Sequence, residues 1–160
     1  MKDIFIDSEI ANKFADPPNQ HYKDFVDWLI KYDEKNKQNN AWIVYSNKLY
    51  TEYTRGAYHC NKETAIATII DTMIQQERFT KISAKQISEF QTKHFTKTIW
   101  KDLRCKRKGS NDPDHIPVVF LSVRKMALCD DDDLSHDLIN FPRFKKDVKV
   151  ASSPELLPYK

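Results

Sequence analysis

Glycine is scarce in this chain, and its scarcity excludes two kinds of nucleotide-binding site. The 160 residues include two glycines, Gly56 and Gly109, whereas average usage would give about 11. A P-loop and a dinucleotide-binding fingerprint both need glycines close together, because the backbone must approach phosphate groups closely. Neither motif is present in the sequence.

Cysteines and long hydrophobic runs are also few. The three cysteines, Cys60, Cys105 and Cys129, are odd in number and far apart. This pattern indicates a reducing compartment and excludes both a disulfide framework and a CxxC zinc site. Apolar runs do not approach the ~18 residues of a membrane span, and the first residues are too polar for a secretory signal. We therefore expect a cytoplasmic protein that makes no contact with a membrane.

Aromatic residues supply enough apolar area for a hydrophobic core. The chain holds nine Phe, seven Tyr and three Trp, and its length is typical of a single domain. We expect one domain over residues 1–151 and a C-terminal tail over residues 152–160.

Charge is distributed unevenly along the chain. Residues 93–108 contain seven basic side chains and one acidic one, whereas residues 112–137 contain seven acidic side chains and two basic ones. This arrangement fits a protein that holds a polyanion on one surface and metal ions on another. A solvated basic helix followed by a polar loop is the alternative. The candidate nucleic-acid contacts are Lys97, Lys101, Arg104, Lys106, Arg107 and Lys108.

Short apolar runs alternate with segments of helical periodicity. Strands are predicted at residues 4–6, 41–45, 125–129 and 148–150, and helices at residues 20–34, 63–76 and 116–125. Ser46 is a predicted N-cap, and Ser83 with Gln86 has the spacing of a capping box. Residues 79–82 are expected to be a short extended link. The alternation predicts an α/β fold, a three-layer α/β/α sandwich with a mostly parallel central sheet.

Acidic residues lie where these strands end. Asp7 directly follows the first strand and Asp131 follows the third, while Glu52 lies one turn into the helix after the second. Asp114 precedes the helix that leads into the third strand. Parallel strands place their carboxyl ends at one edge of a sheet. Four carboxylates meeting there would repel one another, and a divalent cation relieves that repulsion. Oxygen ligands without a His or Cys pattern suit Mg²⁺ or Mn²⁺.

Each acidic residue also has a purely structural interpretation. Asp7 and Asp131 could cap the helices that follow their strands, and Asp114 could be a turn residue beside Pro113. Glu52 could pair with Arg55 on a helix surface. The matching positions of all four favour a shared metal site over these separate roles.

The chain resembles the PIN-domain nucleases in four blocks that run in order along its length. These blocks are Asp3-Ile4-Phe5-Ile6-Asp7-Ser8-Glu9-Ile10, residues 41–53 with Ser46 and Glu52, Asp112-Pro113-Asp114-His115, and Ala127-Leu128-Cys129-Asp130-Asp131-Asp132-Asp133-Leu134. The first block has Ser8 and Glu9 where the family usually has Thr and Asn. The third acidic position is Asp114 or Asp112, and we prefer Asp114. The fourth is taken as Asp131, with Asp130, Asp132 and Asp133 as alternatives.

The resemblance implies a metal-dependent endoribonuclease in which Asp7, Glu52, Asp114 and Asp131 bind Mg²⁺ or Mn²⁺ and carry out catalysis. Many proteins of this family are toxins of toxin–antitoxin pairs, so an antitoxin partner and a homodimer are further implications. A catalytically silent module that binds RNA or protein, and a nuclease of single-stranded DNA, are the alternatives. Trp100 could stack on a base, although its helical spacing favours the core. His115 and His136 are expected near the site, outside the catalytic set.

Overall fold

The fold is an α/β arrangement built on one parallel sheet. The computed structural model describes residues 1–55, 63–106 and 112–160. Within these ranges, five strands pair in the order β3-β2-β1-β4-β5, and every pair is parallel. The strands are β1 (Lys2–Ile6), β2 (Ala41–Tyr45), β3 (Phe79–Lys81), β4 (Met126–Leu128) and β5 (Lys149–Ala151).

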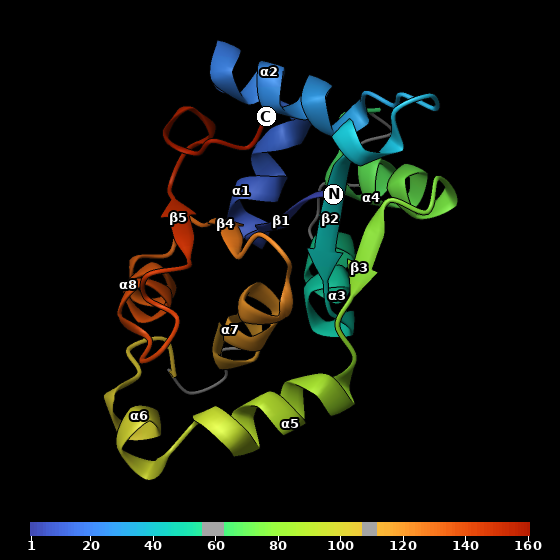
Figure 1. Cartoon of the computed structure of the whole chain (residues 1–160). Coiled ribbons are helices and arrows are strands. Elements are labelled where there is room, and N and C mark those ends of the chain that lie inside the picture. Colours follow the sequence, from blue (N-terminus) through green and yellow to red (C-terminus); the bar gives the residue numbers. More distant parts are fainter. Residues whose placement is uncertain (56–62, 107–111) are drawn as a thin grey trace.

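Helices occupy most of the chain between the strands (Figure 1). The described α-helices are α1 (Ser8–Asn12), α2 (Gln20–Ile30), α3 (Asn47–Arg55), α4 (Ile66–Gln75), α5 (Ala84–His94), α6 (Lys97–Asp102), α7 (Asp112–Leu121) and α8 (Asp132–Asn140). Three short 3-10 helices are η1 (Lys13–Ala15), η2 (Lys37–Asn39) and η3 (Pro154–Leu156). Helices α1 to α4 contact one another as one group, and α7 contacts α5 and α8 as a second. The sheet flanked by these helices confirms the predicted three-layer sandwich.

Strand β1 is the centre of the sheet and of the core. Ile4, Phe5 and Ile6 are fully buried, because β2 pairs with one edge of β1 and β4 with the other. Both faces of a parallel sheet are covered by helices, which explains the continuous apolar run in this strand. The chain moves from β1 to β2 on one side and returns later to β4 on the other, so the strand order reverses at β1. Ligands bind beyond the carboxyl ends of the strands at such a reversal.

Several local predictions are confirmed. Strand β2 has the predicted bounds, and Ser46 Oγ accepts a hydrogen bond from the backbone N–H of Leu49, 3.3 Å away, at the start of α3. The capping box of α5 forms as well, with both Ser83 and Gln86 taking part. These signals depend only on neighbouring residues, so they can be recognised without knowledge of the tertiary structure.

Two elements differ from the prediction. Residues 79–81 form the edge strand β3 and pair with residues 43–45 of β2, whereas a simple link was expected. Helix α7 begins at Asp112, four residues earlier than predicted, and Pro117 therefore lies inside it. Asp112 and Asp114 belong to its first turn, where acidic side chains favour the positive end of the helix dipole.

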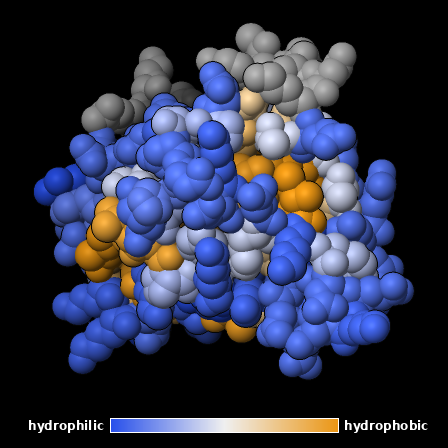
Figure 2. All heavy atoms as spheres, turned by 90° about the horizontal axis from the view of Figure 1, so that it is seen from above, coloured by the Kyte–Doolittle hydropathy of each residue, from blue (hydrophilic) through white to orange (hydrophobic). Residues whose placement is uncertain are grey.

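The final residues pack onto the rest of the fold. Residues 152–160 were expected as a tail beyond the domain, but Leu157 and Tyr159 are buried in the core. The Tyr159 ring packs edge-on against Phe25 of α2, with 4.8 Å between centroids, and Arg124 donates to the carbonyl of Tyr159 at 2.9 Å. Both termini lie near α2 (Figure 1). The surface at this end is mostly hydrophilic and is interrupted by smaller hydrophobic areas (Figure 2). In the described ranges, no helix has both the length and the hydrophobicity to cross a bilayer.

Arg78 joins three elements from inside the molecule. Its side chain is almost completely buried, and Nη1 donates to the carbonyls of Leu29 at 2.9 Å and of Ala41 at 3.0 Å. Leu29 lies in the last turn of α2, where a cation is favourable to the helix dipole. Ala41 begins β2, and the Tyr32 ring lies 5.6 Å from the guanidinium. Arg78 therefore fixes the end of α2 against the beginning of β2.

Arg78→Met is expected to lower the free energy of unfolding by about 2–4 kcal/mol, because it leaves two buried carbonyls without a donor. Urea denaturation followed by circular dichroism measures this change. Lys81→Met, at an exposed position of β3, serves as the matched control and should change stability by less than about 0.5 kcal/mol. Equal effects of the two substitutions would contradict the role assigned to Arg78.

Candidate functional site

Asp7 lies immediately beyond the carboxyl end of β1, at the reversal of strand order. Its backbone N–H donates to the carbonyl of Leu128 in β4 at 2.8 Å, so Asp7 extends the pairing between these strands. The carboxylate Oδ1 accepts from the backbone N–H of Ser8 at 2.9 Å and caps α1. The side chain is 6% exposed, and Oδ2 is buried without a hydrogen-bond partner in the described structure. Asp7 thus performs the capping role and still offers one oxygen.

Burial raises the pKa of Asp7 to about 6. The charge of His115 and the hydrogen bond from Ser8 oppose this increase, while the negative charges of Glu9 and Asp112 add to it. A buried carboxylate with a raised pKa, at a ligand-binding edge, is typical of functional sites.

Glu52 is brought toward the same strand end by α3. His115 of α7 lies beside it, with Nε2 3.2 Å from each carboxylate oxygen of Glu52. The His115 ring is 1% exposed and packs against Phe5, and its Nδ1 is buried with no hydrogen-bond partner. The histidine that was expected only near the site therefore contacts one of the four acidic residues directly.

The hydroxyl of Tyr53 lies at the end of β1, where the charges of Asp7 and Glu52 both act on it. This buried hydroxyl donates a short hydrogen bond to the carbonyl of Ile6. Burial raises the pKa of Tyr53 well above its usual value, and the charges of Asp7 and Glu52 raise it further. Both carboxylates are therefore near the phenol oxygen at the end of β1.

Asp114 turns toward α3 and α5. Its Oδ2 forms a short ion pair with Lys48 Nζ, and its Oδ1 accepts from Gln91 Nε2 at 2.7 Å. The residue lines a cavity of about 220 Å³ between these helices, together with Ser88. Both carboxylate oxygens of Asp114 thus have partners within the chain.

Asp112 is the acidic residue of α7 whose charge reaches Asp7. Its negative charge raises the pKa of Asp7 and also that of the Cys105 thiol. The two residues are separated by two positions, so they project from different sides of the helix. Asp112 and Asp114 therefore have different surroundings, although they belong to the same turn of α7.

Asp131 caps α8, with Oδ1 accepting from the backbone N–H of Leu134 at 2.7 Å. Burial raises the pKa of the Cys129 thiol to about 12, and the charges of Asp7 and Asp131 both contribute. Asp130 instead pairs with Lys13 at 2.7 Å, near the surface, and Asp132 and Asp133 lie in the first turn of α8.

These side chains do not form a complete metal-binding shell. In residues 1–55, 63–106 and 112–160, no group of three or more His, Cys, Asp or Glu side chains is arranged to hold a metal ion. Mg²⁺ usually keeps several waters and needs only one or two protein carboxylates. The unpartnered Oδ2 of Asp7 fits that requirement, and Asp112 supplies a second negative charge nearby.

The basic stretch lies on α6 and the residues after it. Lys97 and Lys101 are exposed on the helix, and Arg104 is exposed beyond its end. Lys106 Nζ donates to the carbonyls of Trp100, at 2.9 Å, and of Lys101, so it caps the helix. Arg107 and Lys108 lie outside the described residues, as does Cys60.

Trp100 does not occupy the core position that its spacing predicted. Its side chain is 47% exposed and touches the Phe95 ring, with 5.7 Å between centroids. The core prediction is wrong here because α6 has no buried residues and packs only at its edge. The exposed indole keeps base stacking open as a role.

Comparisons with known proteins assign no family, since no family model, no curated protein and no solved structure matches this chain. The side chains at the strand ends are therefore the basis on which a function can be proposed.

The raised pKa of Asp7 predicts how stability depends on pH. The folded state favours the neutral acid, so ionisation of Asp7 costs folding free energy as the pH rises from about 4 through 6. In EDTA, the stability of Asp7→Asn relative to the natural protein should therefore increase by about 2–3 kcal/mol between pH ~4 and pH ~7. Denaturant unfolding at several pH values measures this change. Asp16→Asn, at an exposed position, should show no such trend. A stability difference between Asp7→Asn and the natural protein that does not change with pH would contradict the raised pKa of Asp7.

Proposed function

We propose that this protein is a metal-dependent endoribonuclease that hydrolyses RNA phosphodiester bonds at the carboxyl ends of its strands. The proposal rests mainly on one observation: Asp7 Oδ2 is buried at the reversal of strand order and has no hydrogen-bond partner in the described structure. Burying an anionic oxygen without a partner is costly, and a bound cation removes that cost. The PIN-like order of the acidic blocks in the sequence supports the same reading.

Asp7 would hold Mg²⁺ or Mn²⁺, with Glu52, Asp131 and an acidic residue of α7 completing the negative environment. When bound, such an ion lowers the pKa of a coordinated water and stabilises charge on phosphoryl oxygens. His115 holds the Glu52 carboxylate in place through Nε2. The backbone N–H groups of Ser8 and Leu134 donate to Asp7 and Asp131. These hydrogen bonds hold both carboxylates in one orientation before a ligand binds.

The RNA backbone would lie against the basic stretch of α6. Lys97, Lys101 and Arg104 are exposed there, and phosphate contacts of this kind give affinity without sequence preference. Exposed Trp100 lies among them and offers a surface for base stacking. A role as the toxin of a toxin–antitoxin pair, acting as a homodimer, belongs to this proposal and follows from the family resemblance alone.

Digestion of an unstructured RNA with Mn²⁺ or Mg²⁺ tests the activity. We expect cleavage that EDTA abolishes and that Asp7→Asn and Asp131→Asn reduce by about 10²-fold or more, as for loss of a group that stabilises transition-state charge. Asp16→Asn, at an exposed position, should retain full activity. Unchanged cleavage by the Asp7→Asn variant would refute the proposal. Cleavage of single-stranded DNA but not of RNA would show that DNA is the substrate.

The third acidic residue can be identified by paired substitutions. Asp112→Asn should reduce cleavage by about 10-fold or more, because its charge reaches Asp7. Asp114→Asn should have a smaller effect, because Lys48 and Gln91 already satisfy its carboxylate. Initial rates at saturating Mn²⁺ compare the two variants. A larger loss of activity in Asp114→Asn than in Asp112→Asn would show that Asp114 leaves these partners in the active enzyme. Asp114 would then be the third acidic residue, as the sequence analysis preferred.

A catalytically silent RNA-binding module is the second candidate. It is favoured by the observation that Glu52 contacts His115 and that Asp114 is paired twice, which leaves the described acidic set incomplete as a metal shell. Retention of RNA on the natural protein without any cleavage, at every metal tested, would support this candidate over the nuclease.

A further inference from the structure

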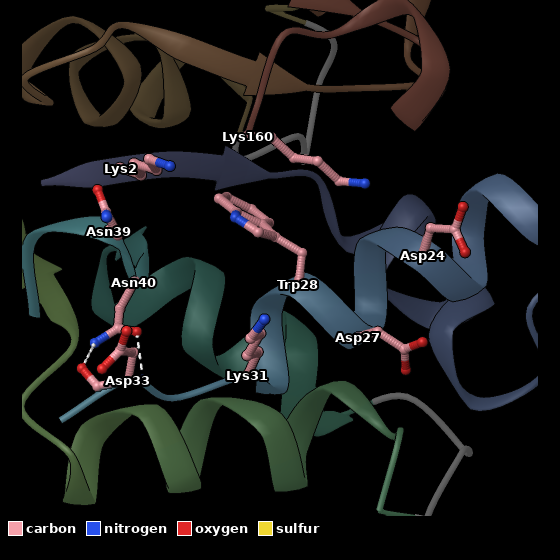
Figure 3. A pocket seen from close by; sticks show the side chains of 9 residues that line it. All are labelled: Lys2, Asp24, Asp27, Trp28, Lys31, Asp33, Asn39, Asn40 and Lys160. Atoms are coloured by element: carbon pink, nitrogen blue, oxygen red, sulfur yellow. Dashed lines mark hydrogen bonds between the residues drawn. The ribbon is translucent and has the colours of Figure 1, made fainter. Parts of the chain in front are cut away.

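A second cavity lies at the end of the molecule opposite Asp7. It has a volume of about 690 Å³ and is bordered by α2, the first residues of β1, the loop before β2 and the last residue of the chain (Figure 3). In its lining, Lys2 is the first residue of β1 and Asn40 directly precedes β2, whereas Asp7 and Ser46 follow these strands. This volume is within the range of sites for small ligands. The cavity is therefore separate from the proposed catalytic edge.

Trp28 is the central apolar group of this cavity. It lies on the face of α2 formed by Asp24, Asp27, Trp28 and Lys31, all of which line the cavity. The indole is held by the Tyr159 ring, with 4.8 Å between centroids, and by Phe25, at 5.5 Å. The side chain remains partly exposed. An aromatic ring fixed in this way presents a rigid surface on which a planar group can stack.

Three ammonium groups from distant parts of the chain surround the indole. Figure 3 shows Lys2, Lys31 and Lys160 around Trp28. In the described structure, the ammonium groups of Lys2 and Lys31 form no hydrogen bond or ion pair, so their charges are available to a ligand. The Lys160 ammonium lies 5.6 Å from the Tyr159 ring. Three cations gathered at one concave surface attract an anion such as phosphate.

The acidic residues of the cavity are arranged differently. Asp24 accepts from Gln20 Nε2 at 2.7 Å, and Asp33 Oδ1 accepts from the backbone N–H groups of Lys35 and Asn36. In Figure 3, Asp24 and Asp27 project on the far side of Trp28 from Lys2. Asp33 lies on the same side of Trp28 as Lys2, and the Lys160 ammonium extends toward Asp24, so cationic and acidic groups are both present around the indole. The carboxylate of Asp27 can accept hydrogen bonds from hydroxyl or amino groups.

We infer that this cavity binds a nucleotide, with its base on Trp28, its phosphate at the Lys31 ammonium and its ribose hydroxyls or amino groups toward Asp27. The ligand is either a free mononucleotide or the phosphorylated end of an RNA strand, because both carry the same chemistry. The inference goes beyond the proposed nuclease activity and does not depend on it, since no residue of the cavity belongs to the catalytic edge.

Isothermal titration with adenosine 5′-monophosphate tests the inference on the full chain carrying Asp7→Asn, in EDTA, so that cleavage cannot contribute. Adenosine and inorganic phosphate are titrated in parallel. We expect the nucleotide to bind more tightly than either fragment, because it uses both the indole and the ammonium groups. Lys31→Gln should weaken binding about 5-fold or more, whereas Lys23→Gln, exposed on α2 outside the cavity, should leave it unchanged.

Trp28→Leu should abolish the advantage of the nucleotide over inorganic phosphate. Because Trp28 contributes to packing, a thermal melt must accompany this variant, and Lys31→Gln provides the test if Trp28→Leu unfolds. Competition by a 5′-phosphorylated oligoribonucleotide, but not by its 5′-hydroxyl form, would assign the site to RNA ends. Absence of competition would assign it to free mononucleotides. Failure of the nucleotide to bind at millimolar concentration, equal binding of phosphate alone, or equal affinity of Lys31→Gln and Lys23→Gln would overturn the inference.

Discussion

The burial of β1 between two parallel neighbours is the constraint on which the rest of the structure depends. Its apolar residues have no exposed face, so β2, β4 and the covering helices must all assemble around them. This assembly carries Asp7 to the reversal of strand order and holds its backbone against Leu128. The carboxylate is buried as a consequence of the strand that precedes it. Its unusual ionisation is therefore a property of the sheet more than of the local sequence.

The four acidic residues chosen from the sequence differ in their surroundings. Asp7 and Asp131 are fixed by helix capping, Glu52 contacts His115, and Asp114 is paired with Lys48 and Gln91. Like charges gathered in one region are tolerated when each is partly compensated by a local donor. In this molecule the compensation is least complete at Asp7. That difference explains why one carboxylate carries the functional argument and the other three support it.

Features that depend on neighbouring residues were predictable, and features that depend on distant contacts were not. The bounds of β2, the cap at Ser46 and the capping box at Ser83 follow from short patterns. Strand β3 was missed because Phe79 is its one strongly apolar residue, whereas the equally short β4 is apolar throughout. The direction in which Asp114 points is decided by α3 and α5, and the burial of His115 by the packing of α7 on β1. The packed position of Tyr159 likewise depends on Phe25, which lies far away in the sequence.

The order of the strands also has a consequence for biosynthesis. Phe5 pairs with Ala127, so one edge of the central strand β1 must wait for its partner until most of the polypeptide has left the ribosome. Contacts between such distant residues slow folding, and unpaired strand edges favour aggregation in the meantime. During most of its synthesis the nascent chain therefore exposes an unpaired edge of β1. The topology that creates the site therefore also favours aggregation while the chain is being made.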